Sequence, residues 1–205
     1  MAQDRGVFIA VEGCDKSGKT EQCRRLTEAL RSVHNICVAP LRFPNRETRI
    51  GKIISDYLKE KQDMEDHAIH LLFAANRWEA AAEIENLLKS QTTLVVDRYS
   101  SSGIAYSASK ENMILNWCKT QDIGLPKPDG TIYLRRPMMD ATDAHERYEM
   151  KDFQENIAKS FDSMRDNDWY TVDGTRSIEE VHREVVTIAL KIIHASKQQC
   201  IKRIA

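Results

Sequence analysis

The sequence is poor in the residues that mark flexible chains, and it has no excess of charge of either sign. It contains 8 glycines and 5 prolines among 205 residues, far below the level that is typical of low-complexity or disordered chains. Its 31 acidic and 30 basic residues leave a formal charge of −1, which excludes a polybasic arm or a bulk electrostatic affinity for nucleic acid. We therefore expect a single globular domain over residues 1–205 that has no nucleic acid as a partner.

Long apolar runs and paired cysteines are also missing. No apolar run exceeds five residues, as at 7–11, so we expect no membrane span, and the amino end lacks the layout of a signal peptide. The five cysteines are widely spaced and form no C-x-x-C pair, which speaks against a zinc knuckle or a redox pair. This usage favours a reducing, cytoplasmic compartment. The cysteines are Cys14, Cys23, Cys37, Cys118 and Cys200.

What the chain does have is an alternation of short apolar runs with longer amphipathic stretches. The apolar runs predict five buried strands, at 7–11, 36–43, 93–96, 131–134 and 169–172. The amphipathic stretches predict helices at about 18–32, 48–60, 66–89, 102–119, 151–165 and 177–196. Such alternation predicts an α/β fold, a five-stranded parallel sheet with helices on both faces and its ligand site at the carboxyl ends of the strands. The last segment, 197–205, is expected to be frayed or loosely docked.

Residues 13–20 match the phosphate-loop pattern G-x-x-x-x-G-K-[ST] without adjustment. Such a loop wraps backbone N–H groups around a phosphate at the start of a helix, with Lys19 reaching the β- and γ-phosphates of ATP and Thr20 binding Mg²⁺. Asp97, which follows the third strand, is the companion acid for the metal. The loop residues predicted to bind ATP are Gly13, Cys14, Asp15, Lys16, Ser17, Gly18, Lys19 and Thr20.

Arginines near strand ends suggest a second anionic substrate beside ATP. Arg46 and Arg98 follow the second and third strands, and Arg77 lies four residues after Phe73 on one helical face. Guanidinium groups suit bidentate phosphate binding, although each arginine by itself is compatible with a solvated surface position. The pair Phe73 and Arg77 could read a nucleobase, and Tyr106 could exclude a 2′-hydroxyl. Ordinary core packing explains the spacing of both aromatic residues equally well or better.

Taken together, these segments resemble thymidylate kinases of the eukaryotic and poxvirus-like type, over nearly the whole chain. The phosphate loop is shared by many enzymes, whereas the full set in this order is specific. The segments are VEGCDKSGKT (11–20), RFPNR (42–46), HLLFAANRWE (70–79), VDRY (96–99), SGIAY (102–106), GLPKPD (124–129) and HERYE (145–149).

The resemblance implies a P-loop nucleoside-monophosphate kinase of three αβα layers that transfers the γ-phosphoryl group of ATP to dTMP with Mg²⁺. It implies that Asp15 faces the deoxyribose 3′-hydroxyl, that Arg46 and Arg98 hold the dTMP phosphate, and that Phe73 and Arg77 bind thymine. It further implies a homodimer built on helix packing. The residues implied to bind dTMP are Asp15, Phe43, Arg46, Phe73, Arg77, Arg98, Gly103, Tyr106 and Tyr148.

The resemblance also implies the remaining roles at the site. Thr20 and Asp97 serve the metal, and Arg176 falls where the family places its adenine-side loop. An acceptor phosphate is nucleophilic at neutral pH, so catalysis reduces to alignment and to cations that neutralise charge on the moving group. The catalytic candidates are Asp15, Lys16, Lys19, Arg98 and Arg147.

Two features depart from the family pattern. The lid, at about 137–150, is short, and Arg147 is its only basic residue. Gly130 stands where a bulky apolar residue would open strand four, and glycine there weakens a strand. The short lid keeps open a different function, that of a catalytically weak nucleotide-binding relative acting as a sensor or partner-binding protein. A GTP switch is disfavoured, because the chain has no Asn-Lys-x-Asp segment.

Overall fold

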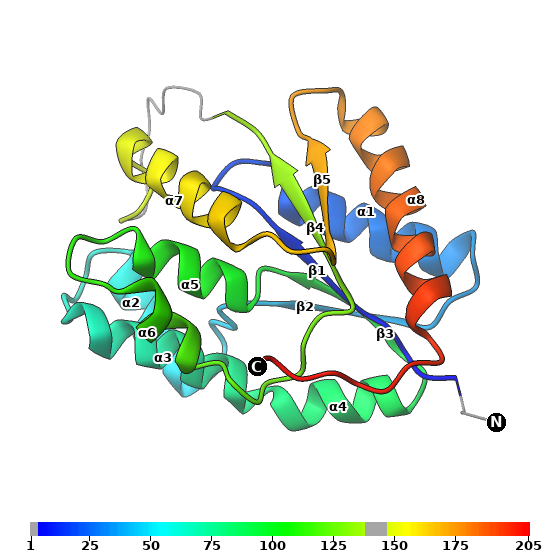
Figure 1. The fold of residues 1–205 in the computed structure, drawn as a ribbon, viewed down its shortest axis with the longest axis horizontal. Coiled ribbons are helices and arrows are strands. Elements are labelled where there is room, and N and C mark those ends of the chain that lie inside the picture. The colour runs from blue at the N-terminus through cyan, green and yellow to red at the C-terminus, as the bar shows by residue number, and fades with distance from the viewer. Residues whose placement is uncertain (1–3, 138–146) are drawn as a thin grey trace.

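The computed structural model describes residues 4–137 and 147–205. Five parallel strands form one sheet in the order β2-β3-β1-β4-β5 (Figure 1), which confirms the predicted fold class. The strands are β1 (Phe8–Glu12), β2 (Val38–Arg42), β3 (Thr93–Asp97), β4 (Gly130–Arg135) and β5 (Trp169–Asp173).

Helices cover both faces of this sheet, because the side chains of β1 alternate between two cores. Ile9 and Val11 pack with residues of α1 and α8, whereas Phe8 and Ala10 pack with α4. The helices are α1 (Lys19–Ser32), α2 (Arg49–Leu58), α3 (Asp66–Glu79), α4 (Ala81–Lys89), α5 (Ser100–Ala108), α6 (Leu115–Thr120), α7 (Lys151–Met164) and α8 (Ile178–Ser196).

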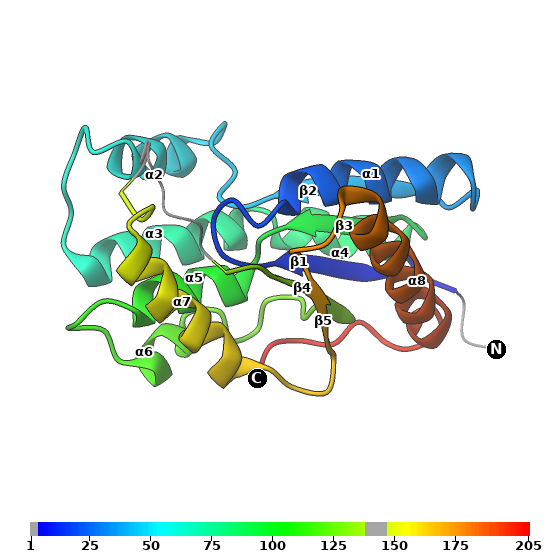
Figure 2. The same cartoon turned by 90° about the horizontal axis from the view of Figure 1, so that it is seen from above.

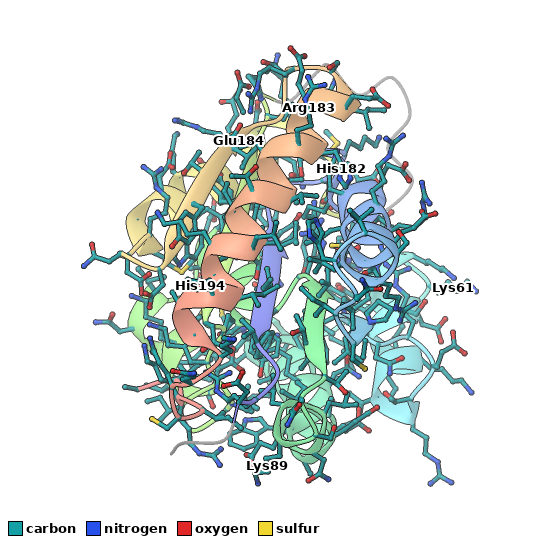
Figure 3. The ribbon with its side chains drawn as sticks, turned by 90° about the vertical axis from the view of Figure 1, so that its right-hand side faces the viewer. Lys61, Lys89, His182, Arg183, Glu184 and His194 are labelled. Carbon is teal, nitrogen blue, oxygen red and sulfur yellow. The ribbon has the colours of Figure 1, made fainter. Side chains whose placement is uncertain are left out.

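The helices form two groups in space, and α7 of the larger group packs Ile157 and Phe161 against Tyr133 of β4 and Trp169 of β5. In both Figure 1 and Figure 2, α2, α3, α5, α6 and α7 gather at the left, while α1 and α8 lie at the right with the sheet. Figure 3 faces α8, where Arg183 and Glu184 lie toward one end of the helix and His194 toward the other. No helix in the described part of the chain is long and apolar enough to cross a membrane.

Two of the predicted helices are each two helices. The stretch 66–89 divides at Ala80, because α3 packs against α2 and α5 whereas α4 turns Ile84 and Leu88 onto the sheet. The stretch 102–119 begins at Ser100 and divides into α5 and α6 at a polar turn that contains Lys110. The expectation of five fully buried strands is also wrong for the two edge strands, β2 and β5, since each has a neighbour on one side only.

The structure explains why position 130 is a glycine and shows where the last nine residues lie, which the sequence did not reveal. A Cβ on Gly130 would lie 2.5 Å from Cδ1 of Ile192, so glycine lets α8 pack close to β4. The segment 197–205 is docked rather than frayed. Backbone hydrogen bonds join Ile204 to Gly124 and Leu125, its side chain packs on the core of β1 and β3, and Arg203 pairs with Glu85 at 2.7 Å.

Candidate functional site

The phosphate loop, residues 13–20, connects the end of β1 to the start of α1. Three of its residues have positive φ angles, at 150° for Gly13, 59° for Lys16 and 92° for Gly18. Positive φ turns successive N–H groups toward one side, which forms a concave anion site in front of the helix. A Cβ on Gly13 would lie 2.6 Å from the carbonyl oxygen of Leu134, so only glycine lets the loop pass the end of β4.

Lys19 lies buried inside this loop. Its ammonium group donates to the carbonyl oxygen of Cys14 and, at 3.2 Å, to Oγ of Ser17. Burial, together with the nearby Arg98, lowers the pKa of Lys19 to about 8. A desolvated cation held by weak neutral acceptors gains interaction energy when an anion arrives. The side chain is therefore placed to bind phosphate.

Thr20 and Asp97 meet at the metal position that the sequence predicts. The Thr20 hydroxyl donates to Oδ2 of Asp97 at 2.7 Å, and Nε of Arg42 lies 3.6 Å from the same oxygen. Oδ1 of Asp97 is buried and has no hydrogen-bond partner among the described residues. A carboxylate oxygen and a hydroxyl beside a phosphate loop are the ligand types that suit Mg²⁺ or its water shell.

Asp15 and Arg98 form an ion pair where the loop meets the pocket described below. Nη1 of Arg98 also donates to the Gly13 carbonyl and to Oγ of Ser102, each at 3.2 Å. Burial by itself raises the pKa of Asp15, but the cations of Arg98 and Lys19 outweigh it and hold the pKa below its ordinary value. Asp15 is therefore a carboxylate near pH 7 and fixes the guanidinium group beside the loop.

Two buried residues that the sequence did not single out hold this ion pair in place. Gln154 of α7 accepts from the Asp15 N–H at 2.9 Å and donates to Oδ2 of Asp15 at 2.7 Å. Glu12 accepts from the backbone N–H groups of Tyr99 and Ser102, at 2.9 and 3.2 Å, and from the Ser102 hydroxyl. The acid at the end of an apolar strand was a signal for Glu12, whereas no local pattern points to Gln154.

A pocket opens from Asp15 and Arg98 toward α3, α5 and the segment before α7; we call it the acceptor pocket. All nine residues that the resemblance implies for dTMP line it. Phe73 is half-buried, so it both packs on the core of α2 and α3 and faces the pocket. The lining residues are Asp15, Arg42, Phe43, Pro44, Arg46, Leu58, Phe73, Arg77, Arg98, Tyr99, Ser102, Gly103, Tyr106, Ser107, Tyr148 and Glu149.

Arg77 is buried and held by Asp122, a partner that the sequence did not reveal. Nε and Nη2 of Arg77 contact Oδ1 of Asp122 at 3.0 and 2.8 Å, and Nη2 contacts Oδ2 at 2.8 Å. Nη1 has no hydrogen-bond partner in the described part of the chain and lies where a Cβ on Gly103 would be only 2.5 Å away. Glycine at 103 thus leaves room for a guanidinium group with one donor edge still available at the pocket.

The aromatic rings of Tyr106 and Tyr148 form another part of the pocket wall. The ring centroids of Tyr106 and Tyr148 are 5.7 Å apart, and the guanidinium carbon of Arg98 lies 5.2 Å from the centroid of Tyr106. The Tyr106 hydroxyl is buried and interacts with the Asp15 carboxylate, which helps to hold the pKa of Asp15 below its ordinary value. Tyr106 and Asp15 thus lie together on the wall of the pocket.

Two predicted residues lie apart from this cluster. Arg147 donates to the Tyr57 carbonyl at 3.2 Å and pairs with Asp63 at 2.9 Å, so its guanidinium group points to α2. Arg176 pairs with Glu184, near one end of α8 (Figure 3). Lys16, in contrast, belongs to the phosphate loop and lies 3.2 Å from Oε2 of Glu149, which lines the acceptor pocket. Most of the predicted lid, residues 138–146, falls outside the described residues.

Comparison with known proteins gives consistent results. The sequence profile of the family "Thymidylate kinase" matches residues 11–185. The chain is 44% identical to the thymidylate kinase of Homo sapiens, with 97% of each chain covered. It is 37% identical to a putative thymidylate kinase of Invertebrate iridescent virus 6, which covers 93% of this chain. A solved thymidylate kinase structure from Candida albicans superposes with a TM-score of 0.86 at 31% identity over 99% of the chain.

Proposed function

The chain belongs to the thymidylate kinase family, and we propose how its residues transfer the γ-phosphoryl group of ATP to dTMP, which gives dTDP and ADP. One observation carries the proposal. The acceptor pocket opens directly onto the phosphate loop, and the ion pair between Asp15 and Arg98 lies at their junction. Two phosphorylated ligands can therefore meet end to end at this point.

The phosphate loop holds the donor. Its backbone N–H groups, at the positive end of α1, bind the β-phosphate region of ATP, and Lys19 neutralises the phosphates. Lys16 lies at the mouth of the loop, and the segment with Arg176 follows β5 on the side assigned to the adenine ring. A Cβ on Gly174 would lie 3.6 Å from the Ser17 carbonyl oxygen, so this segment adjoins the loop.

Thr20 and Asp97 would hold Mg²⁺. Oδ1 of Asp97, which has no hydrogen-bond partner among the described residues, and the Thr20 hydroxyl fit such an ion, because one or two protein oxygens would hold it or its waters beside the nucleotide phosphates. When it is bound, the ion supplies positive charge to the transferring group. Asp97 itself fixes the Thr20 hydroxyl through their hydrogen bond.

The acceptor pocket holds dTMP. We assign the phosphate of dTMP to Arg46 and Arg98, thymine to the face of Phe73, and a thymine carbonyl oxygen to the Nη1 edge of Arg77. Tyr106 and Tyr148 then enclose the sugar, and Asp15 faces its 3′-hydroxyl. Phe43 and Gly103 shape the floor, since Gly103 leaves the space that Arg77 occupies.

Catalysis in this arrangement is alignment together with charge neutralisation. A phosphate dianion needs no general base, so the protein has to keep the two phosphates in line and offer cations where charge moves. Lys19 lies on the donor side, and Arg98 reaches from the acceptor side to the Gly13 carbonyl. Arg147 is not part of this proposal, because Tyr57 and Asp63 hold its guanidinium group.

We also propose a homodimer. Leu71 and Trp78 of α3, and Ile123 after α6, are 46%, 42% and 50% exposed, and large apolar side chains exposed near one another mark interaction surfaces. A Cβ on Gly124 would lie 3.3 Å from the Trp78 ring, which places the 121–124 turn beside α3. Sedimentation of wild type and of Leu71→Asp tests this proposal. If the dimer forms through α3, wild type sediments as a dimer and Leu71→Asp sediments as a monomer.

A steady-state assay with ATP, Mg²⁺ and dTMP tests the proposed function. We expect dTDP formation, and a loss of about 30- to 1000-fold in kcat/KM in Arg98→Ala, which corresponds to removal of one preorganised charge. Arg24→Ala, which removes an exposed arginine of α1 that pairs with Glu21 and Glu28, is the control. Tight binding of both nucleotides without turnover would instead support a weak, nucleotide-sensing relative, and a wild-type rate in folded Arg98→Ala would refute the role of Arg98.

A further inference from the structure

Tyr148 of the acceptor pocket is connected to three residues that lie outside the proposed binding set. Its hydroxyl donates to the Tyr57 hydroxyl of α2 at 2.9 Å. Lys110, in the turn between α5 and α6, donates to the same Tyr57 oxygen at 3.2 Å and to Oδ1 of Asp66 at 2.6 Å. Four side chains from four separate segments therefore form one hydrogen-bonded chain.

Lys110 is the centre of this network. Its side chain is only 10% exposed, and its ammonium group lies 5.4 Å from the ring centroids of both Tyr57 and Tyr148. A cation with so little exposure needs compensation, which Asp66 gives as a charge and the two ring faces give as cation–π contacts. An unbranched apolar side chain in its place would leave Asp66 and Tyr57 without this donor.

Tyr148 is fixed at its backbone as well as at its hydroxyl. The preceding N–H, of Arg147, donates to the Leu58 carbonyl at 3.0 Å, and the Tyr148 carbonyl accepts from Nε2 of Gln154 at 2.7 Å. The ring stacks on Phe153, with centroids 5.2 Å apart. The hydroxyl contact with Tyr57 adds to these backbone and ring contacts and fixes the far end of the side chain.

We propose that Tyr57, Lys110 and Asp66 are positioning residues that hold the Tyr148 ring against the acceptor pocket and thereby set the affinity for dTMP. This inference rests on the proposed function, because it takes dTMP as the occupant of the pocket. The Tyr148 hydroxyl proton is committed to Tyr57, so Tyr148 offers the ligand its ring and an acceptor oxygen rather than a donor. None of the three residues touches the phosphate loop, so the network acts on the acceptor side.

The test is Tyr57→Phe, which removes one oxygen and leaves the ring. We expect the Kd for dTMP, measured by calorimetry, and the KM for dTMP to rise about three- to tenfold, as for a lost hydrogen bond that orders a binding group. The kcat and the KM for ATP are expected to stay within about twofold, since a loss of uniform binding raises KM alone. Tyr170→Phe is the matched control, because Lys191 lies 5.2 Å over the Tyr170 ring, outside the acceptor pocket.

A double-mutant cycle separates positioning from a general loss of stability. If Tyr57 acts through Tyr148, then Tyr57→Phe has little further effect on the dTMP Kd in a Tyr148→Phe background. Full additivity of the two changes, or equal dTMP Kd values for wild type and Tyr57→Phe, would overturn the network. A wild-type protein that neither binds nor phosphorylates dTMP would overturn the proposed function, and this inference with it.

Variants at Lys110 test the network independently of Tyr57. Lys110→Met keeps an unbranched side chain of similar length but removes the cation. This variant is expected to raise the dTMP Kd by at least as much as Tyr57→Phe. Lys110→Arg is expected to restore part of the affinity, because it keeps a charge that can reach Asp66. Thermal melting shows which variants are folded, and folded Lys110→Met with the wild-type Kd for dTMP would contradict the assignment.

Discussion

The phosphate loop and the acceptor pocket are neighbours, but the sequence builds them in different ways. The loop is one continuous segment, residues 13–20, whose shape follows from two glycines and from positive φ angles within the segment. The acceptor pocket takes its lining from five stretches of chain, at 15, 42–58, 73–77, 98–107 and 148–149. The loop is thus a local structure, whereas the pocket exists only after the chain has folded.

This difference extends to how charge is supported. Lys19 in the loop is held by neutral oxygens of Cys14 and Ser17, so its positive charge is available to an anionic ligand. Arg77 in the pocket is bound to Asp122 from 45 positions away along the chain. We infer that substitutions in the loop change chemistry with little effect on folding, while substitutions in the pocket change both.

The largest expected effect tests that inference at Arg77. Arg77→Met leaves the Asp122 carboxylate buried with only the Ser100 hydroxyl among its described partners, and an unpaired buried charge costs about 3–5 kcal/mol of stability. We expect urea denaturation to show a loss of this size, together with weaker dTMP binding. Replacing both charges, in Arg77→Met with Asp122→Asn, is expected to recover part of the stability.

An exposed ion pair is the control for Arg77. Arg135 lies 3.3 Å from Asp162, and the arginine side chain is 60% exposed, so Arg135→Met is expected to cost less than about 1 kcal/mol. If Arg77→Met were no more destabilising than Arg135→Met, the pocket would not depend on its buried pair.

The next effect is on chemistry and belongs to the loop. Lys19→Ala is expected to lower kcat/KM by a factor that corresponds to about 2–4 kcal/mol of transition-state stabilisation. The unfolding midpoint is expected to stay at or above that of wild type, because the variant loses a buried cation that has no carboxylate partner within 4 Å in the described chain. Steady-state assays and urea denaturation on the same preparation measure both quantities. Lys52→Ala, on the exposed side of α2, is the control.

A large loss of stability in Lys19→Ala would contradict this contrast, because folding would then depend on the charged side chains of the loop as much as on those of the pocket. A wild-type rate would remove Lys19 from the donor site.

The sequence predicted most of what is local. The α/β class, the five strands, the phosphate loop and the pairing of Thr20 with Asp97 follow from apolar periodicity and from one motif. Asp97 was predictable because the carboxyl ends of parallel strands share one edge of the sheet, so the acid after β3 must lie beside the loop after β1.

What the sequence could not show is pairing across distance. Asp122 follows a short helix with no motif around it, and Gln154 is one polar residue in an amphipathic helix, yet these two residues orient Arg77 and Asp15. The resemblance to a family gave the nine pocket residues without their supports. Periodicity also missed the division at Ala80, because both halves are amphipathic and only their different packing partners separate them.

A smaller effect is expected from the carboxyl-terminal segment, which supports the pocket from outside. Deletion of residues 201–205 removes partly buried Ile201 and Ile204 and the backbone hydrogen bonds to Gly124 and Leu125, close in sequence to Asp122. We expect a loss of about 2 kcal/mol in stability, and a rise in the Kd for dTMP that exceeds any rise for ATP. Calorimetric titrations with each nucleotide measure the two affinities.

Arg203→Ala is the control for the deletion, because it removes the half-exposed ion pair with Glu85 and the side-chain hydrogen bond to the Gly124 carbonyl but leaves Ile201 and Ile204 in place. It is expected to cost about 1 kcal/mol, less than the deletion. If the deletion weakened ATP binding as much as dTMP binding, the two sites would share their supports, contrary to the comparison above.

The smallest effect on nucleotide binding is a pH dependence confined to the loop. Because burial lowers the pKa of Lys19 from 10.5 to about 8, the fraction of protein with a charged Lys19 falls about threefold between pH 7.5 and 8.5. The Kd for ATP is therefore expected to rise about threefold over this interval, while the Kd for dTMP changes less.

The stability of the ligand-free protein is expected to change in the opposite direction with pH. Between about pH 8 and 10.5 the unfolded chain binds the proton that folded Lys19 has lost, so this residue makes the ligand-free protein more stable as pH rises. Lys19→Arg, which stays charged, is expected to abolish both trends, and their persistence in that variant would assign them to another group.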